Sequence, residues 1–346
     1  MKATIKKHTL QFHRPSGTSR GVLKTKDSWF LILNDNGSTS IGECSIIEGL
    51  NPESPEIVER RLSSICNLIN NKEEVRDSIF ENAPSVRFAY EMAIRDKKTG
   101  NKRELYSNSF LNGEGIPING LIWMGEPDYM LKQIKDKLDK GYDCLKLKIA
   151  AIDFESEIDL LKKIRQEFNN ENLEIRLDAN GGFNNGEALA QLQQLSEYNI
   201  HSIEQPIKQG QWNEMAKLIY SSPIPIALDE ELIGIELEED KQDLIKAINP
   251  DYIILKPSLL GGFQKLKEWI DIADERNIKW WVTSALESNI GLSAIAQWTN
   301  SLNLTMKYQG LGTGQLYSNN IPSPLYIDQG ALYYGSNSWD LNLIGC

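Results

Sequence analysis

The chain has 346 residues, enough for about two domains and for a core that needs no disulfide support. Its net charge of −11 argues against a nucleic-acid surface and against an anionic membrane surface, because both need basic patches. No apolar run approaches the roughly 18 residues of a membrane span, and no signal-peptide core follows the basic start, so we expect a cytoplasmic protein. Four cysteines without CxxC spacing and three scattered histidines favour neither a disulfide framework nor a zinc site.

The first part of the chain has mixed α+β character. Strands are expected at residues 22–26, 29–33 and 39–43. The last two are separated by Asn34-Asp35-Asn36-Gly37, a turn signal typical of a hairpin. A helix is expected after Pro55, where apolar residues recur at helical spacing, and a second over residues 86–96.

From about Pro117 onward, short apolar segments alternate with amphipathic ones. The strand candidates are residues 118–122, 144–149, 173–179, 200–205, 224–229, 252–256, 280–284 and 308–311. The helix candidates are residues 155–168, 186–198, 211–221, 263–276 and 291–300. Eight strands alternating with helices predict an α/β fold, a (β/α)₈ barrel of the TIM type. A doubly wound sheet is the alternative, but no GxGxxG motif follows a strand.

Charged residues stand at the ends of successive strand candidates. In chain order they are Lys146 and Lys148, Asp178, Glu204, Asp229 and Lys256. Any one of them alone would more often be a loop or capping residue. Their order and near-constant spacing place them together at the carboxyl-terminal rim of a barrel, where barrel enzymes keep their active sites.

The residue types at this rim indicate a particular chemistry. Asp178, Glu204 and Asp229 would crowd three negative charges together, and an all-oxygen ligand set favours Mg²⁺, or Mn²⁺ in its place. Lys148 and Lys256 flank the carboxylates, and nearby cations would lower their pKa toward that of a base. A divalent ion with a lysine on each side suits removal of a proton α to a carboxylate.

Several neighbouring residues are expected in supporting roles. Lys146 adds a second cation beside Lys148, and Asn180 and Glu230 are expected to orient the ligands and lysines. Trp123 is interpreted as a core or pocket-wall residue. The Trp280-Trp281 pair is interpreted as packing, with one ring on each side of a strand.

At this point the sequence resembles the enolase superfamily, in its muconate-lactonising-enzyme-like branch. The resemblance spans nearly the whole chain and rests on five segments: residues 84–93, 145–148, Asp178-Ala179-Asn180-Gly181, Ile203-Glu204-Gln205-Pro206 and Leu228-Asp229-Glu230. It implies an α+β capping domain over residues 1–115, a modified barrel over 116–320 and a segment, 321–346, that returns to the capping domain. It also implies mobile loops closing over the pocket, near residues 16–20, with Ser19 and Arg20, and near 43–50.

Within this branch, residues 284–292 and the glycine-rich residues 310–314 resemble the dehydratases of menaquinone biosynthesis. The resemblance implies an anionic small-molecule substrate, 2-succinyl-6-hydroxy-2,4-cyclohexadiene-1-carboxylate. Lys148 would remove its α-proton and return it to the departing hydroxyl on the same face. Lys256 would stabilise the anion from the opposite face. Ser284 and Gly312 would contact the substrate.

Two other interpretations remain open at this stage. The same groups would serve a racemase of N-succinylamino acids or a dipeptide epimerase, and a barrel that only binds a metabolite is a further alternative. Dipeptide epimerases of this branch resemble one another in an acidic pair at the end of the eighth strand. Residues 308–316 contain no carboxylate, which favours a dehydratase. The sequence leaves the oligomeric state undetermined.

Overall fold

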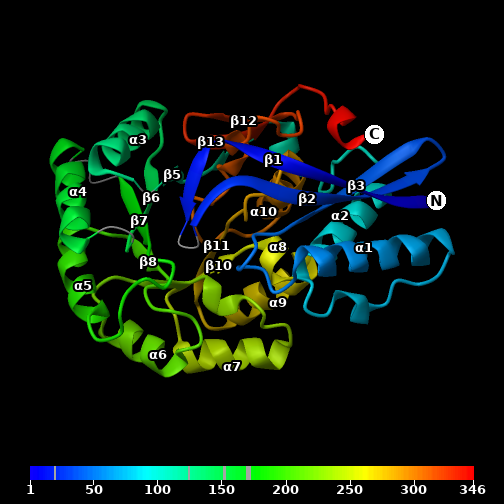
Figure 1. Cartoon of the computed structure of the whole chain (residues 1–346). Helices are drawn as coiled ribbons and strands as arrows, with labels where there is room; N and C mark the ends of the chain where they lie inside the picture. The colour runs from blue at the N-terminus through cyan, green and yellow to red at the C-terminus, as the bar shows by residue number, and fades with distance from the viewer. Residues whose placement is uncertain (19–20, 124, 151–152, 169–172) are drawn as a thin grey trace.

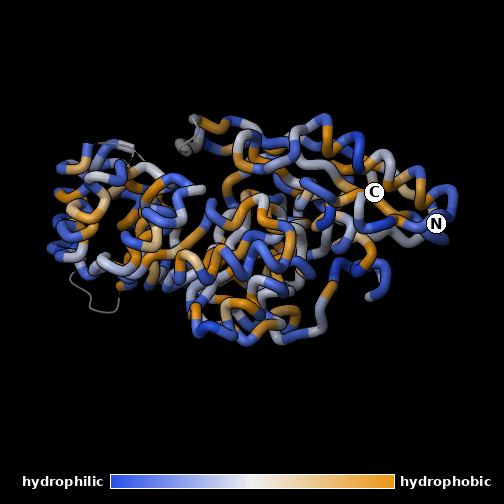
Figure 2. Tube along the Cα trace, turned by 90° about the horizontal axis from the view of Figure 1, so that it is seen from below, coloured by the Kyte–Doolittle hydropathy of each residue, from blue (hydrophilic) through white to orange (hydrophobic). Residues whose placement is uncertain are grey.

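The computed structural model describes residues 1–18, 21–123, 125–150, 153–168 and 173–346. A small antiparallel sheet and two helices lie beside a parallel barrel surrounded by helices (Figure 1). The two termini lie at the same end of the molecule in both Figures 1 and 2. In Figure 2, hydrophobic positions recur along helices that are otherwise hydrophilic, as expected for helices with one face on a core. None of the helices in the described ranges is long and apolar enough to cross a membrane.

The N-terminal sheet has the order β1-β2-β3, from β1 (Lys2–Thr18), β2 (Gly21–Asp35) and β3 (Ser38–Ser45). Asn36 and Gly37 both have positive φ, 51° and 83°, which matches the tight turn expected there. The expected break between residues 26 and 29 is wrong, because β2 is one continuous strand paired on both sides. The sequence analysis also missed β1, whose lysines and histidines hide its alternating pattern.

Two helices cover this sheet. Ser54 accepts the backbone N–H of Ile57 at the start of α1 (Pro55–Asn70), and proline stands in the first turn of both α1 and α2 (Pro84–Lys98). Helix α2 packs closely on β3, since a Cβ on Gly42 would lie 1.8 Å from the carbonyl oxygen of Ala89. Both expected helices are present, and α2 is also the layer between the sheet and the barrel (Figure 1).

The barrel sheet has seven parallel strands in sequence order. They are β5 (Gly120–Ile122), β6 (Cys144–Lys148), β7 (Glu174–Asp178), β8 (Ser202–Glu204), β9 (Ile226–Leu228), β10 (Tyr252–Leu255) and β11 (Lys279–Val282). The expected eighth strand forms only bridges: Gln309 pairs in parallel with Ile118, and Gly310 with Thr283. These bridges join the first and last strands, so the predicted modified barrel is confirmed.

Helices surround the barrel as crossover connections. They are α3 (Pro127–Asp139), α4 (Phe154–Glu167), α5 (Ala188–Leu195), α6 (Trp212–Ser221), α7 (Glu238–Ile248), α8 (Pro257–Leu260), α9 (Gly262–Glu275) and α10 (Asn289–Asn300). The 3₁₀ turns are η1 (Asp77–Phe80), η2 (Phe110–Asn112), η3 (Ser196–Tyr198), η4 (Glu230–Leu232), η5 (Thr313–Leu316) and η6 (Asn342–Ile344). The sequence analysis did not list α3 or α7, both rich in charged residues.

The last part of the chain turns back toward the beginning. Strands β12 (Leu325–Asp328) and β13 (Ala331–Tyr334) form a three-stranded sheet with β4 (Ile116–Pro117), which precedes the barrel. Near the end of the chain, η6 lies against β1. The division at residues 115 and 320 stays a prediction.

Candidate active site

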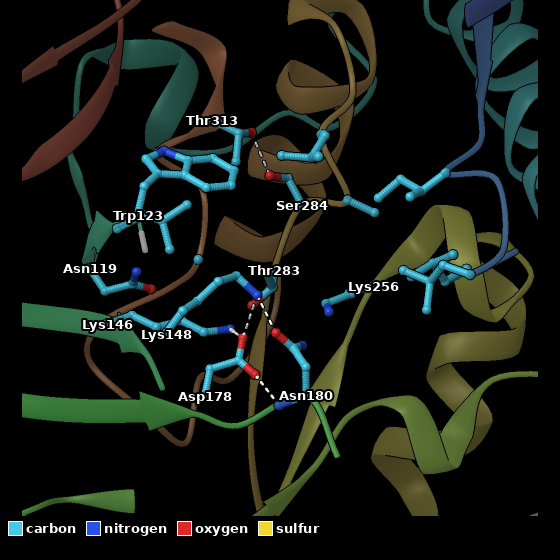
Figure 3. A pocket seen from close by; sticks show the side chains of 18 of the residues that line it. Asn119, Trp123, Lys146, Lys148, Asp178, Asn180, Lys256, Thr283, Ser284 and Thr313 are labelled. Atoms are coloured by element: carbon cyan, nitrogen blue, oxygen red, sulfur yellow. Dashed lines mark hydrogen bonds and ion pairs between the residues drawn. The ribbon is translucent and has the colours of Figure 1, made fainter. Parts of the chain in front are cut away.

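A cavity of about 130 Å³ opens at the carboxyl ends of the barrel strands (Figure 3). Its polar wall includes Lys146, Lys148, Asp178 and Lys256, four of the six charged residues expected at this rim. Its opposite wall is apolar, and Leu23, Ile47 and Leu50 of the N-terminal part of the chain contribute to it. The cavity therefore lies between the barrel on one side and β2 and the loop after β3 on the other.

The pairing of β6 with β7 brings the first charged groups together. Lys148 is opposite Asp178 in the register, and Lys146, two residues earlier, lies on the same side of its strand. The Lys146 Nζ lies 2.9 Å from the Asp178 carboxylate and 2.6 Å from that of Glu204 on β8. The Lys148 Nζ lies 3.1 Å from Asp178, while Lys256, which follows β10, pairs with Asp229.

Burial and these ion pairs shift the pKa values of the buried groups in opposite directions. Burial raises the pKa of Asp178, but the Lys146 and Lys148 ammoniums outweigh it and hold that pKa below its usual range. Burial lowers the pKa of Lys146 and Lys256, yet the surrounding carboxylates raise both above the ordinary lysine value. The sequence analysis expected neighbouring cations to lower the pKa of Lys256; its pKa is raised instead, because the carboxylates around it outweigh the cations.

Asn180 connects a lysine to an acid. Its Oδ1 accepts a hydrogen bond from the Lys148 Nζ at 2.5 Å, and its Nδ2 donates to Glu230 at 3.0 Å. Asn180 has a positive φ of 45°, a conformation that asparagine tolerates better than most residues. The backbone N–H of Asn180 donates to Asp178, so the loop after β7 fixes both the carboxylate and the amide. This geometry is what the expected orienting role requires.

Glu204 and Asp229 lie beneath the cavity surface, each about 2% exposed. Burial raises the pKa of Glu204 well above its usual value, and nearby Asp178 adds to the rise. Within the described residues, no three His, Cys, Asp or Glu side chains already form a metal-holding group, since lysines lie between the carboxylates. Two buried carboxylate oxygens, Glu204 Oε1 and Glu230 Oε2, have no hydrogen-bond partner. A buried all-oxygen donor set with unpartnered atoms fits a hard divalent cation.

The far side of the cavity carries hydroxyl groups and glycines. The Ser284 hydroxyl lies 2.5 Å from that of Thr313, and both residues line the cavity with Gly312 (Figure 3). Trp123 forms part of the wall, and Gln133 of α3 bonds both its backbone N–H and its carbonyl at 3.0 Å. Ser284, Gly312 and Trp123 thus line the cavity, and a substrate contact of Ser284 and Gly312 stays a prediction.

The described residues include part of the two expected closing loops. Ser19 and Arg20 lie outside the described residues. Leu23 on the neighbouring strand lines the cavity, as do Ile47 and Leu50 in the second expected loop. These three apolar side chains cover the polar wall from the N-terminal side, in the place that closing loops would need.

Some cavity residues escaped the sequence analysis. Asn119, Thr283 and Leu259 line the cavity, and no charge or motif marks them in the sequence. Thr313 also lines it, and the sequence analysis named only the glycine-rich segment 310–314 around it. Thr283 and Thr313 flank strand ends that were recognised, so inspecting neighbours of Ser284 and Gly312 would have found them. Leu259 follows Lys256 by three residues in α8, a helix too short to be predicted from periodicity.

Known proteins resemble this chain throughout its length. Residues 129–335 match the family described as Enolase C-terminal domain-like. The o-succinylbenzoate synthase of Desulfotalea psychrophila (strain LSv54) is 47% identical, across 96% of this chain and 98% of that protein. The crystal structure of MenC from Desulfotalea psychrophila LSv54 has a TM-score of 0.85 and 44% identity, and covers 96% of this chain and 99% of that one.

A more distant neighbour shares the fold alone. A dipeptide epimerase of Cytophaga hutchinsonii, crystallised with Mg and the dipeptide D-Ala-L-Val, has a TM-score of 0.81 at 21% identity. The match covers 97% of this chain and 94% of that one. On the family match and the full-length relative at 47% identity, this chain belongs to the enolase superfamily and, within it, to the o-succinylbenzoate synthase family.

Proposed function

We propose that this protein is an o-succinylbenzoate synthase, a carbon–oxygen lyase that removes water from 2-succinyl-6-hydroxy-2,4-cyclohexadiene-1-carboxylate to form 2-succinylbenzoate. The observation that carries the proposal is 47% identity to the Desulfotalea enzyme over almost the whole of both chains. The cavity supports it, because its lysines and carboxylates suit removal of a proton next to a carboxylate.

Lys148 is the proposed base and acid. It takes the proton from the carbon that bears the carboxylate. The electron pair of the broken C–H bond moves toward the carboxylate, and the substrate becomes an enediolate. The enediolate then returns this electron pair to the ring as the new C=C bond and becomes a carboxylate again. The ring hydroxyl leaves with the C–O electron pair and receives the same proton from Lys148, forming water. The bonds from Lys148 to Asn180 and Asp178 support this role, because they hold its Nζ at the cavity wall.

Lys256 and a divalent cation are the proposed stabilisers of the anion. Lys256 lines the cavity from another strand and carries a raised pKa, so it supplies a positive charge to the developing enediolate. Asp178, Glu204 and Asp229 would hold Mg²⁺, and a bound cation would neutralise charge on the substrate carboxylate. Lys146 pairs with Asp178 and Glu204, and its positive charge would favour the ionised form of both carboxylates.

The glycine-rich wall favours this reaction over dipeptide epimerisation. Ser284, Thr313 and Gly312 offer hydroxyl and backbone groups, and residues 308–316 contain no carboxylate to hold a substrate ammonium. An unpaired ammonium buried there would cost several kcal/mol. N-succinylamino acids are anionic like the cyclohexadiene substrate, so this wall disfavours their racemisation less strongly than it disfavours dipeptide epimerisation.

A substrate panel tests the proposal. The purified protein with Mg²⁺ is assayed by chromatography on the cyclohexadiene substrate, on N-succinylamino acids and on dipeptides. We expect efficient dehydration, weak or absent racemisation and no epimerisation. Dipeptide epimerisation with a kcat/KM equal to or above that for dehydration would overturn the assignment. Binding of the cyclohexadiene without turnover or α-proton exchange would instead favour a metabolite-binding barrel.

A further inference from the structure

A buried polar cluster lies behind the apolar wall of the cavity, where the N-terminal sheet meets the barrel. Two acids are its centre: Glu43 on β3 and Glu287 in the loop after β11, both fully buried. Lys26 of β2 is buried near both carboxylates and bonds the Ser45 hydroxyl. The two acids approach one another at Gly291, where a Cβ would lie 2.8 Å from the Glu287 Cβ and 2.9 Å from Glu43 Oε2.

Glu287 joins two pieces of the cavity. Its Oε1 accepts the hydroxyl of Ser258, which lies in α8 two residues after Lys256. Its Oε2 accepts the backbone N–H of Ala285 at 2.7 Å, in the segment of Ser284, Ala285 and Leu286 that lines the cavity. One carboxylate therefore sets the separation between the turn that carries Lys256 and the opposite wall.

Glu43 extends this connection to the N-terminal sheet. It accepts the Ser288 backbone N–H at 2.8 Å, the Ser288 hydroxyl at 2.6 Å and the Gly291 N–H at 2.8 Å. It also accepts the Ser28 hydroxyl of β2 at 2.8 Å. β3 ends at Ser45, and the chain continues directly to the cavity residues Ile47 and Leu50.

The backbone between these contacts needs such support. Leu286 has a positive φ of 65°, an unfavourable conformation for leucine, and the Tyr317 hydroxyl holds its carbonyl oxygen at 2.6 Å. On the other side, the backbone N–H groups of Leu259 and Leu260 both donate at 3.0 Å to the carbonyl oxygen of Lys256. Ser258 therefore transmits its bond with Glu287 directly to the turn that begins at Lys256.

We propose that Glu287 is a positioning residue for the reaction, because its bonds to Ser258 and Ala285 hold Lys256 opposite the cavity wall of residues 284–286. Together with Glu43, it fixes Lys256 and this wall relative to the N-terminal sheet. This role gives a function to the Glu287-Ser288 motif, which the site itself does not use. The inference rests on the proposed function where it is tested by kcat. Its second test, hydrogen exchange in α8, does not depend on that function.

The experiment compares four variants with the wild type. Glu287→Leu and Ser258→Ala remove the bond between the acid and α8. Glu287→Gln can keep both bonds, because its carbonyl accepts from Ala285 while its amide donates to the rotatable Ser258 hydroxyl. Ser293→Ala is the matched control, since Ser293 is a buried serine of α10 that bonds Gln297 and lies outside the cavity wall.

We expect Glu287→Leu to lower kcat about 100-fold and Ser258→Ala about 10-fold, with KM within about threefold, as for other groups that orient catalytic residues. Glu287→Gln should recover kcat to within about threefold of wild type. Hydrogen exchange at the Leu259 and Leu260 amides should accelerate in Ser258→Ala but not in Ser293→Ala, with the thermal transition recorded for each protein.

Each result decides the question. A folded Ser258→Ala protein with wild-type kcat and wild-type exchange at these amides would overturn the positioning role. A rise in KM alone would also overturn it, because it would make the cluster part of substrate binding. A wild-type protein that does not dehydrate the cyclohexadiene would refute the proposed function, while the exchange comparison would still decide the inference.

Discussion

Charged side chains are buried at both ends of the barrel. Strand β7 contributes one charged side chain to each end. Arg176 lies toward the amino ends of the strands and Asp178 at the carboxyl end, on the same side of the strand two residues apart. Arg176 is 2% exposed and Asp178 1%, so burial alone does not distinguish them. What differs is the set of partners at each end.

At the amino end, the guanidinium is enclosed by an acid, a backbone carbonyl and an aromatic ring. Arg176 donates to Glu174 at 2.7 Å and to the Tyr308 carbonyl at 3.1 Å, and it lies 4.3 Å above the Trp281 ring. Trp281 packs with Ala227 and Ile254 into a closed cluster. At the carboxyl end, lysines and carboxylates surround a cavity and two carboxylate oxygens have no partner. Arg176 Nη2 also makes no hydrogen bond, but it lies 2.6 Å from the Glu174 carboxylate. A buried charge enclosed by packed groups stabilises the fold, whereas one beside a cavity is available for chemistry.

Removal of divalent metal is the strongest test of this contrast. We expect exhaustive chelation to abolish dehydration and added Mg²⁺ to restore it, because the carboxylates at the cavity are the only proposed site that needs a cation. Calorimetric titration should show Mg²⁺ binding that Glu204→Gln weakens at least about tenfold. Full activity after chelation, with no Mg²⁺ binding, would refute the metal assignment.

Substitution of the proposed base comes next. Lys148→Ala should lower kcat by about 10³-fold or more, because general acid–base groups contribute about 10²–10⁴-fold, and it should also abolish α-proton exchange. The thermal transition should stay close to that of wild type. Lys162→Ala, on the exposed face of α4, is the control and should keep full activity. Near-normal dehydration by Lys148→Ala would show that the base is misassigned.

The contrast also explains what the sequence could reveal. Asp178, Glu204 and Asp229 were visible because a charge at the end of an apolar strand breaks the expected pattern. Looking for charges at strand ends did not identify Arg176, because this residue stands inside a strand next to Leu177 and belongs to no family motif. Thr283 and Thr313 escaped because a threonine in a strand or turn is ordinary, and only the closed barrel brings them to the cavity.

The remaining errors have local causes. β1 begins with Lys2 and contains two further lysines and two histidines in its exposed and half-buried positions, so its alternation is weak until β2 pairs with it. The eighth strand was predicted as a full strand, but Gln309 and Gly310 close the barrel with two bridges. Contacts such as Glu287 with Ser258 join residues 29 positions apart and depend on tertiary packing.

A substitution at the amino end should separate stability from activity. Arg176→Met removes the guanidinium from Glu174 and the Tyr308 carbonyl, and we expect the free energy of unfolding to fall by about 2 kcal/mol. This is less than for a fully buried pair, because Glu174 is 20% exposed. Urea denaturation measures the loss, and kcat of the folded protein should stay within about twofold of wild type. A large fall in kcat without loss of stability would show that the two ends are not independent.

The smallest expected effect is a pH dependence of stability at the amino end. The His201 ring packs at a tilt of 36° against Tyr252, with ring centroids 5.3 Å apart, and its Nδ1 lies 2.9 Å from the Ser202 hydroxyl. Burial lowers the pKa of His201 below the ordinary histidine value. The Glu174 carboxylate raises this pKa, whereas the positive charges of Arg176 and Lys279 lower it further. The folded state therefore binds the His201 proton less tightly than the unfolded state does. For this reason the free energy of unfolding of the protein falls as the pH drops below about 6.5.

His201→Gln keeps a polar side chain but cannot titrate, so it isolates this contribution from every other acid and base in the chain. Between pH 7.5 and pH 5 the wild type should lose about 1–2 °C in Tm relative to the variant. The pH profile of kcat should be the same in both proteins, because His201 lies at the end of the barrel away from the cavity lysines. Parallel Tm curves would show that His201 does not titrate differently on folding. A shifted kcat profile would show instead that the amino end influences the chemistry at the other end.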